Sequence, residues 1–400
     1  MPGRGSWGAG AFGSATVGAV LFACRVAAAQ DEASEAARSG QPSPRAAWTA
    51  HGYVEAYYEW NFHRPANHVN HHRAYDSQHN AFTVQNAVLG TEIRSGRAGV
   101  RMTVQSGAMP QVDGTSLGPA PPLHSESHDR QHLKEANVGY EVPLADALAL
   151  EAGLFVWPMG LESSAVHENW CWSRSNLYLA MPSRFAGARA TYPASGQFNA
   201  SFGVFNGWTG LTENNEEKTF SGGFRYEVPA SIRTGLRYIG GVERDPDAPE
   251  GRPWRHVVGA YVQSLGTERI TLGLEGNGGW EATALGTTWW VAAALQVRVR
   301  VAEPLSFAAR LDGIRQLAGE RGGEAAMPIL FVGPGVGSGT MTIEIRPQDG
   351  VSMMVEMRRD QGGSPQFFRG EILGTGSETS PYEPNSMWQQ TVLIGATAWL

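Results

Sequence analysis

The chain has 400 residues, of which 17% are charged and 10% aromatic, and it contains 50 glycines. Its formal net charge is −7 and it has no basic tract, which argues against nucleic acid as a partner. After the N-terminal leader there is no run of about eighteen apolar residues, which excludes a transmembrane helix.

The N-terminus has the pattern of a signal peptide. Arg4 precedes an apolar run rich in Ala, Gly and Val, and the small residues before Gln30 provide a cleavage site. We therefore expect a signal peptide at 1–29, a disordered periplasmic tether at 30–47 and a barrel domain at 48–400. The alternative for the leader is a disordered Ala-rich tail on a cytosolic protein.

Cleavage would remove Cys24 and leave Cys171 alone, so no internal disulfide is expected in the mature chain. Cleavage also removes two arginines, Arg4 and Arg25, and takes the net charge from −7 to −9.

From residue 49 onward the chain contains segments of about ten residues in which apolar residues recur at every second position. Val100 and Met102 fall on one face of their segment, and Arg101 and Thr103 fall on the other. A β-strand with lipid on one side and water on the other must alternate in this way, whereas a helix would space its apolar residues three or four apart. The pattern predicts sixteen strands, at 49–62, 80–94, 98–107, 132–142, 148–156, 184–193, 197–206, 218–228, 231–240, 254–264, 268–277, 287–301, 304–313, 338–346, 350–359 and 388–400.

Short and long connections alternate between these segments. The even-numbered gaps are tight turns such as 95–97, whereas the odd-numbered gaps are long. This rhythm is typical of a transmembrane antiparallel up-and-down β-barrel, with short periplasmic turns and long extracellular loops, in the outer membrane of a Gram-negative bacterium. A soluble sandwich or propeller is the main structural alternative. The long gaps are 63–79, 108–131, 157–183, 207–217, 241–253, 278–286, 314–337 and 360–387.

The chain ends in an aromatic strand that closes with Trp399 and Leu400, which fits the signal that barrel-assembly machinery reads during biogenesis. We expect outer-membrane lipids around the barrel, and the sequence leaves a homo-oligomer open.

The parity of the strands also predicts the residues that line the pore. Ten acidic and ten basic residues fall on the polar face, so the wall has no net bias and the excess negative charge belongs to loops, turns and tether. Weak cation preference in dilute salt would follow, because screening fades as salt is diluted. The candidates are Glu55, Glu59, Glu92, Arg94, Arg101, Glu135, Glu151, Arg189, Arg225, Glu227, Arg233, Arg237, Glu275, Arg298, Arg310, Asp312, Glu344, Arg346, Glu356 and Arg358.

The loop at 157–183 is a candidate constriction, since a loop of this length can fold inward. It carries Trp170, Cys171, Trp172 and Arg174, and we expect the lone thiol to be partly buried because an exposed one is reactive. The alternative is a loop packed on the rim.

Histidines gather in the long loops and suggest a metal site, because imidazole binds zinc, copper and nickel. Their spacing matches no compact site, so we expect no metal and no cofactor, and solvated histidines that charge at low pH. They are His63, His68, His71, His72, His79, His124, His128, His132 and His167.

Several short motifs resemble the outer-membrane β-barrel porins of the porin-2, OmpL-like family, and the resemblance spans essentially the mature chain. It implies a barrel and a pore but no particular substrate. The motifs are residues 52–58, residues 151–161 followed by Glu162, Trp172-Ser173-Arg174-Ser175, Thr191-Tyr192, Phe205-Asn206-Gly207-Trp208 and residues 214–219.

The sequence therefore predicts a porin, not an enzyme, for passive diffusion of small hydrophilic solutes or ions. The alternatives are a barrel enzyme of lipase or protease type, for which no motif fixes a Ser/His or Asp/His set, and a plugged structural or adhesive barrel.

Overall fold

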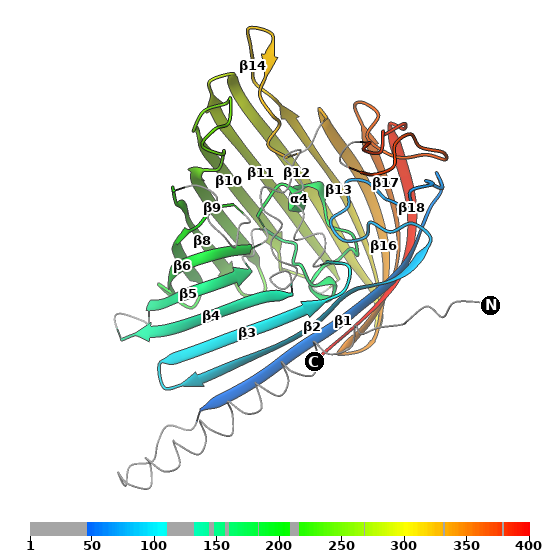
Figure 1. The fold of residues 1–400 in the computed structure, drawn as a ribbon. Coiled ribbons are helices and arrows are strands. Elements are labelled where there is room, and N and C mark those ends of the chain that lie inside the picture. Colours follow the sequence, from blue (N-terminus) through cyan, green and yellow to red (C-terminus); the bar gives the residue numbers. More distant parts are fainter. Residues whose placement is uncertain are drawn as a thin grey trace, which may run out of the picture. The chain divides into compact units, whose positions relative to one another are not determined.

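Sixteen antiparallel strands close into one barrel in the computed structural model, which describes residues 46–109, 132–143, 148–156, 160–182, 184–208, 216–267, 269–330, 333–377 and 380–400 (Figure 1). Each strand pairs with its neighbour in sequence, and β1 closes the ring against β18. The barrel strands are β1 (Ala47–Asn61), β2 (Ala81–Ser95), β3 (Ala98–Ser106), β4 (Leu133–Val142), β5 (Leu148–Val156), β6 (Arg184–Tyr192), β7 (Phe198–Phe205), β8 (Thr219–Val228), β9 (Ile232–Val242), β10 (Trp254–Ser264), β11 (Ile270–Thr283), β12 (Gly286–Ala302), β13 (Leu305–Leu317), β16 (Gly335–Gln348), β17 (Val351–Gly362) and β18 (Trp388–Trp399). The predicted sixteen-stranded barrel is confirmed.

Burial alternates along the strands as a two-faced wall requires. In β1 the Glu55 side chain is buried inside the barrel, whereas its neighbour Val54 is 50% exposed on the outer face. In β17 the same holds for Glu356 and Val355, which are 2% and 44% exposed. Exposed outward residues are mostly apolar, so the outer surface suits hydrocarbon.

Two of the predicted long loops are wrong in extent. The stretch 278–286 was expected to be a loop, but β11 runs on to Thr283 and pairs it with Gly286 at the start of β12. Clustered glycines at 276, 278 and 279 imitate a turn in the sequence, while the strand continues through them. The gap 314–337 contains a small hairpin of β14 (Glu320–Arg321) and β15 (Glu324–Ala325).

The described part of the loop between β5 and β6, residues 160–182, folds into the barrel and contains η1 (Val166–Glu168) and α4 (Asn176–Leu179). Figure 1 shows α4 among the strands. Leu177 of α4 and the following Ala180 pack in an apolar cluster with inward side chains of β5, β6, β7, β9, β10, β12, β13 and β16. The main apolar core of the protein therefore lies inside the barrel.

No helix among the described residues is long and apolar enough to span a membrane. The predicted signal peptide and the tether up to residue 45 lie outside the described residues.

Candidate functional site

Wall carboxylates hold the loop 160–182 inside the barrel by accepting its backbone N–H groups. These amides have no hydrogen-bond partner within the loop backbone. Each one donates to a buried wall carboxylate, so the amide and the carboxylate both gain a partner away from water. The bonds run from Leu161 to Glu275 (2.8 Å), Val166 to Glu55 (2.6 Å), Trp172 and Ser173 to Glu356 (2.6 and 3.0 Å), and Asn176 to Asp312 (2.7 Å).

The four residues proposed for a constriction lie in this loop. Trp170 lines a cavity, while Cys171 is buried, as expected from the hazard of an exposed thiol. The Trp172 ring is fully buried and packs over Gly395 of β18, where an added Cβ would lie 2.4 Å from the ring. Arg174 donates to the carbonyls of Ser163 and Ser164, each at 2.7 Å, and to that of Trp172. The rim-packed alternative is therefore wrong.

A second network ties the loop to β13. Glu162 accepts a hydrogen bond from Arg310 at 2.7 Å and binds Ser175 through both its backbone and its hydroxyl. Arg310 also pairs with Asp312 at 3.0 Å and donates to the Ser173 carbonyl at 2.7 Å. This network therefore fixes the loop to β13.

The first loop, residues 62–80, also attaches to the inner wall. The buried guanidinium of Arg73 pairs with Asp76 (2.8 Å) and with Asp360 of β17 (2.9 Å), and Asn70 donates to Glu59 at 2.8 Å. Sequence periodicity could not reveal Arg73, because it lies in a loop without a repeating pattern.

Four of the five histidines of the first loop are buried or half-buried rather than solvated, which corrects the sequence-based expectation for His63, His71, His72 and His79, whereas His68 is exposed. His71 donates to the Gln366 carbonyl at 2.6 Å, and the rings of His71 and His72 lie 4.2 Å apart. Burial lowers the pKa of His71, and it lowers that of His72 to about 3. Within the described ranges no three His, Cys, Asp or Glu residues are placed to hold a metal ion. His124 and His128 lie outside those ranges.

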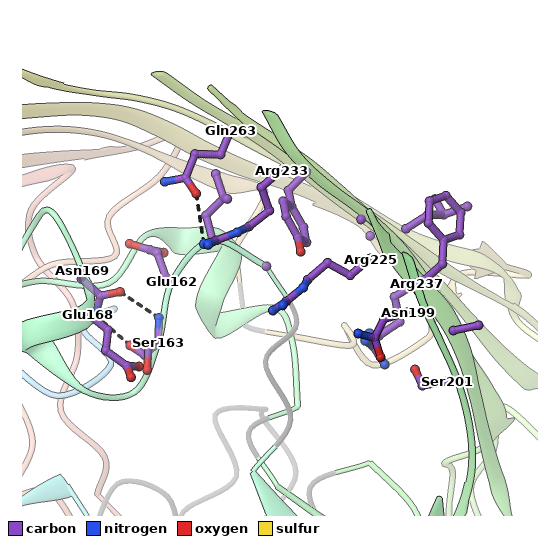
Figure 2. A pocket seen from close by; sticks show the side chains of 18 of the residues that line it. Glu162, Ser163, Glu168, Asn169, Asn199, Ser201, Arg225, Arg233, Arg237 and Gln263 are labelled. Carbon is purple, nitrogen blue, oxygen red and sulfur yellow. Dashed lines mark hydrogen bonds between the residues drawn. The ribbon is translucent and has the colours of Figure 1, made fainter. Parts of the chain in front are cut away.

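A cavity of about 670 Å³ remains between the loop and the wall formed by β6 to β10 and β12. Glu162, Glu168 and Trp170 line it on the loop side. Four arginines line the opposite wall, and Figure 2 shows Arg225 and Arg233 pointing from that wall into the cavity. The arginines are Arg189, Arg225, Arg233 and Arg237.

Among the residues that the structure describes, two wall carboxylates pair with these arginines. Glu151 binds Arg189 at 2.6 Å, and Glu227 binds Arg233 at 2.7 Å and lies 3.9 Å from Arg225. The side chain of Arg225 is 57% exposed. The predicted balance of wall charge is therefore not uniform in space: the charged wall side chains that line the cavity are all arginines, whereas the wall carboxylates that accept the loop amides lie elsewhere.

The predicted wall charges fall into three groups. Those buried against the two inward loops are Glu55, Glu59, Glu275, Arg310, Asp312, Glu356 and Arg358. Those that line the cavity are the four arginines named above. The others form contacts along the wall or with a strand backbone, and they are Glu92, Arg94, Arg101, Glu135, Glu151, Glu227, Arg298, Glu344 and Arg346.

Further charged residues inside the barrel were missed, and they include Glu281, Lys134 and Asp360. The pairing of β4 with β3 shifts register opposite Thr103 and Val104 of β3, and this bulge turns Lys134 of β4 inward. The Lys134 ammonium contacts the hydroxyl of Tyr53. Asp360 continues the inward parity of Glu356 and Arg358, but the predicted strand ended one residue before it.

Comparison with known proteins agrees with this architecture. The family described as "Putative beta-barrel porin-2, OmpL-like" matches residues 48–398. The solved structure of outer-membrane expressed OmpT from Vibrio cholerae has a TM-score of 0.57 at 8% identity, covering 90% of this chain and 99% of that one. The outer membrane channel DcaP of Acinetobacter baumannii has a TM-score of 0.56 at 9% identity, covering 89% and 97%.

An anion-selective porin from Comamonas acidovorans is similarly related in fold, with a TM-score of 0.57, 10% identity and coverage of 89% of this chain and 100% of that one. No curated protein sequence matches the chain significantly. The family match covers nearly the whole barrel, and the chain therefore belongs to the β-barrel porin-2, OmpL-like family of outer-membrane porins.

Proposed function

We propose that small hydrophilic solutes and ions cross this outer-membrane channel between the loop 160–182 and the wall of β6 to β10, with a preference for anions. The observation that carries the proposal is the distribution of wall charge: four arginines line the cavity from the wall, while wall carboxylates such as Glu275 and Glu356 are bonded to the loop. On the loop side the cavity is lined by Glu162 and Glu168. Arginine rings and clusters favour anions in pores because a passing ion meets their field at close range.

The other lining side chains support a wet route. Asn199, Ser201 and Gln263 contribute amide and hydroxyl groups to the same wall (Figure 2). Such groups replace part of the hydration shell of a passing solute, so the cavity suits water and polar molecules.

The route can be tested with single cysteines in a Cys171→Ser background. Ser201→Cys places a thiol in the cavity, whereas Phe202→Cys places one on the outer face, where Phe202 is 54% exposed. We expect a bulky charged thiol reagent to reduce single-channel conductance only at position 201. Equal conductance before and after modification at 201 would reject this route.

A plugged barrel is the second candidate, and the apolar cluster around α4 favours it because it fills part of the interior. Purified protein without any conductance in planar bilayers would select this candidate over the channel.

The family match supports a channel rather than an enzyme, so we expect purified protein to hydrolyse neither esters nor peptides. A homo-oligomer is also proposed, supported by a solved trimer form of Vibrio cholerae OmpT with a TM-score of 0.55. Light scattering of the purified barrel tests this, and a monomer at every concentration would contradict it.

A further inference from the structure

Three arginines surround one tyrosine on the cavity wall. In the register of β8 and β9, Arg225 lies opposite Gly235, so Arg233 and Arg237 are its two diagonal neighbours. Diagonal Cβ atoms on paired strands lie about 7–8 Å apart, within reach of long side chains. On the other side of β9, Tyr261 of β10 also lies opposite Gly235.

Gly235 leaves room for the tyrosine at the centre of this group. An added Cβ at position 235 would lie 2.7–3.0 Å from the Tyr261 ring and hydroxyl, so the ring lies across the glycine. Tyr261 and the four arginines all line the same cavity, and we call Arg189, Arg225, Arg233 and Arg237 the arginine cluster.

On the described part of the wall, the four guanidinium groups of the arginine cluster lie with two carboxylates, Glu151 and Glu227. Across the cavity lie Glu168 and Glu162, and Glu162 is bonded to Arg310. A dianion placed among the four arginines would relieve the repulsion between the guanidinium groups. The exposed guanidinium of Arg225 presents parallel N–H donors that match two oxygens of an oxyanion. Asn199 and Gln263 lie in the same wall and add neutral donors.

We propose that the arginine cluster with Tyr261 is a saturable binding site for small, doubly charged oxyanions. The chemistry that it recognises is a pair of oxygens sharing negative charge, as in phosphate and sulfate or in a short dicarboxylate. The proposed site names a class of solute for the proposed channel, and it rests on that proposal because it assumes that the cavity lies on the solute route. A monovalent halide uses only one donor at a time, so it should bind much more weakly.

The test is calorimetric titration of the purified full-length barrel with inorganic phosphate, sulfate, succinate and chloride. We expect saturable binding of at least one dianion and none of chloride. Phosphate and sulfate binding without succinate would assign tetrahedral oxyanions, and the reverse would assign dicarboxylates. Either result supports the site, whereas dianion binding no stronger than that of chloride overturns it.

Variants distinguish binding at the arginine cluster from nonspecific attraction of anions to positive charge. Arg225→Gln should weaken binding by about tenfold or more, since a charge-assisted bidentate contact is lost. Arg225→Lys should restore part of the affinity, because the charge remains but the fork is lost. Tyr261→Phe should cost roughly threefold, as expected for one neutral hydrogen bond. Arg315→Gln on the outer face removes the same charge outside the cavity and should bind like the unmodified protein.

Heat-modifiable gel mobility shows that each variant is a folded barrel before it is titrated. Equal affinities in Arg225→Gln and the unmodified protein would overturn the proposal. Because titration needs no conductance, a barrel that binds dianions but carries no current would reject the proposed channel route and leave the site standing. A conducting barrel without dianion binding would do the opposite.

Discussion

Glu356 Oε2 lies 2.6 Å from the backbone nitrogen of Trp172, joining two residues 184 positions apart in the chain. The same carboxylate accepts from Ser173 and from the Thr342 hydroxyl, so three donors converge on one buried acid. Glu55, Glu275 and Asp312 accept loop amides in the same way. Their role in the structure is to satisfy backbone amides that are removed from water.

Glu356→Gln should release the loop. A glutamine turns N–H groups toward at least one of the donors that the carboxylate accepted, and a buried polar group left without a partner costs about 1–3 kcal/mol. We expect a lower unfolding temperature and noisier single-channel currents. Glu303→Gln, in the exposed turn before β13, removes the same charge without a loop contact and should change neither quantity.

Gly395→Ala tests whether the Trp172 ring packs against β18 at Gly395. The added Cβ would lie 2.4 Å from the indole ring, so the ring or the loop must shift. We expect altered conductance and lower stability, although alanine is the better residue in a strand interior. Gly337→Ala is the matched control, because no atom lies within 4 Å of the position of its Cβ. Identical currents and stability in both variants would show that Trp172 does not pack there.

The assignment of faces in β11 predicts opposite results at adjacent positions. Leu272 is 49% exposed on the outer face, and an arginine there costs about 2–4 kcal/mol near the bilayer midplane. Leu272→Arg should therefore assemble poorly, whereas Thr271→Arg points inward and should assemble and change conductance. Equal amounts of folded barrel in outer-membrane fractions would refute the face assignment of this strand.

Acid should loosen the first loop. The pKa values of His71 and His72 are lowered by burial, so the folded loop holds both rings neutral. Their contribution to stability is complete above the ordinary histidine pKa of about 6.5 and is lost as the pH falls from there toward the folded-state values. Hydrogen exchange in residues 62–80 should accelerate below about pH 6.5, relative to the adjoining strand β1.

His71→Phe with His72→Phe removes the titrating groups while keeping planar rings. This double variant should show little acceleration of exchange over the same pH range. If both proteins respond equally, the acid response must come from other groups.

The strand pattern could be predicted from the sequence because a membrane wall forces a period of two, and each exposed charge on the wrong face would be costly. The period also identified the inward residues of β1, β13 and β17. It was weaker for 184–193, because inward residues such as Phe185 become apolar where they meet the α4 cluster. An apolar inward face removes the contrast on which the prediction depends.

The use of each inward charge could not be predicted, because parity places a residue inside the barrel without saying what it meets there. Glu356 and Glu227 have the same parity, yet one binds loop amides and the other binds arginines. That difference depends on the path of the loop 160–182, whose sequence has no repeating pattern. The register shift that turns Lys134 inward is equally invisible to a fixed period.

Ion selectivity also depends on which charges face the cavity and not only on the net charge of the chain. The net charge of the loops and tether predicted weak cation preference in dilute salt, through a field that reaches about 30 Å at 0.01 M ionic strength but only about 3 Å at 1 M. The arginine cluster acts on ions inside the cavity at close range, so its effect should survive in concentrated salt.

The most direct measurement is the reversal potential of the purified protein in a planar bilayer under a KCl gradient, taken with both sides near or above about 1 M, where distant charges are screened. The arginine cluster predicts anion preference under these conditions, and Arg225→Glu should reduce or reverse it. Cation preference in concentrated salt, unchanged in Arg225→Glu, would contradict a route along the arginine wall.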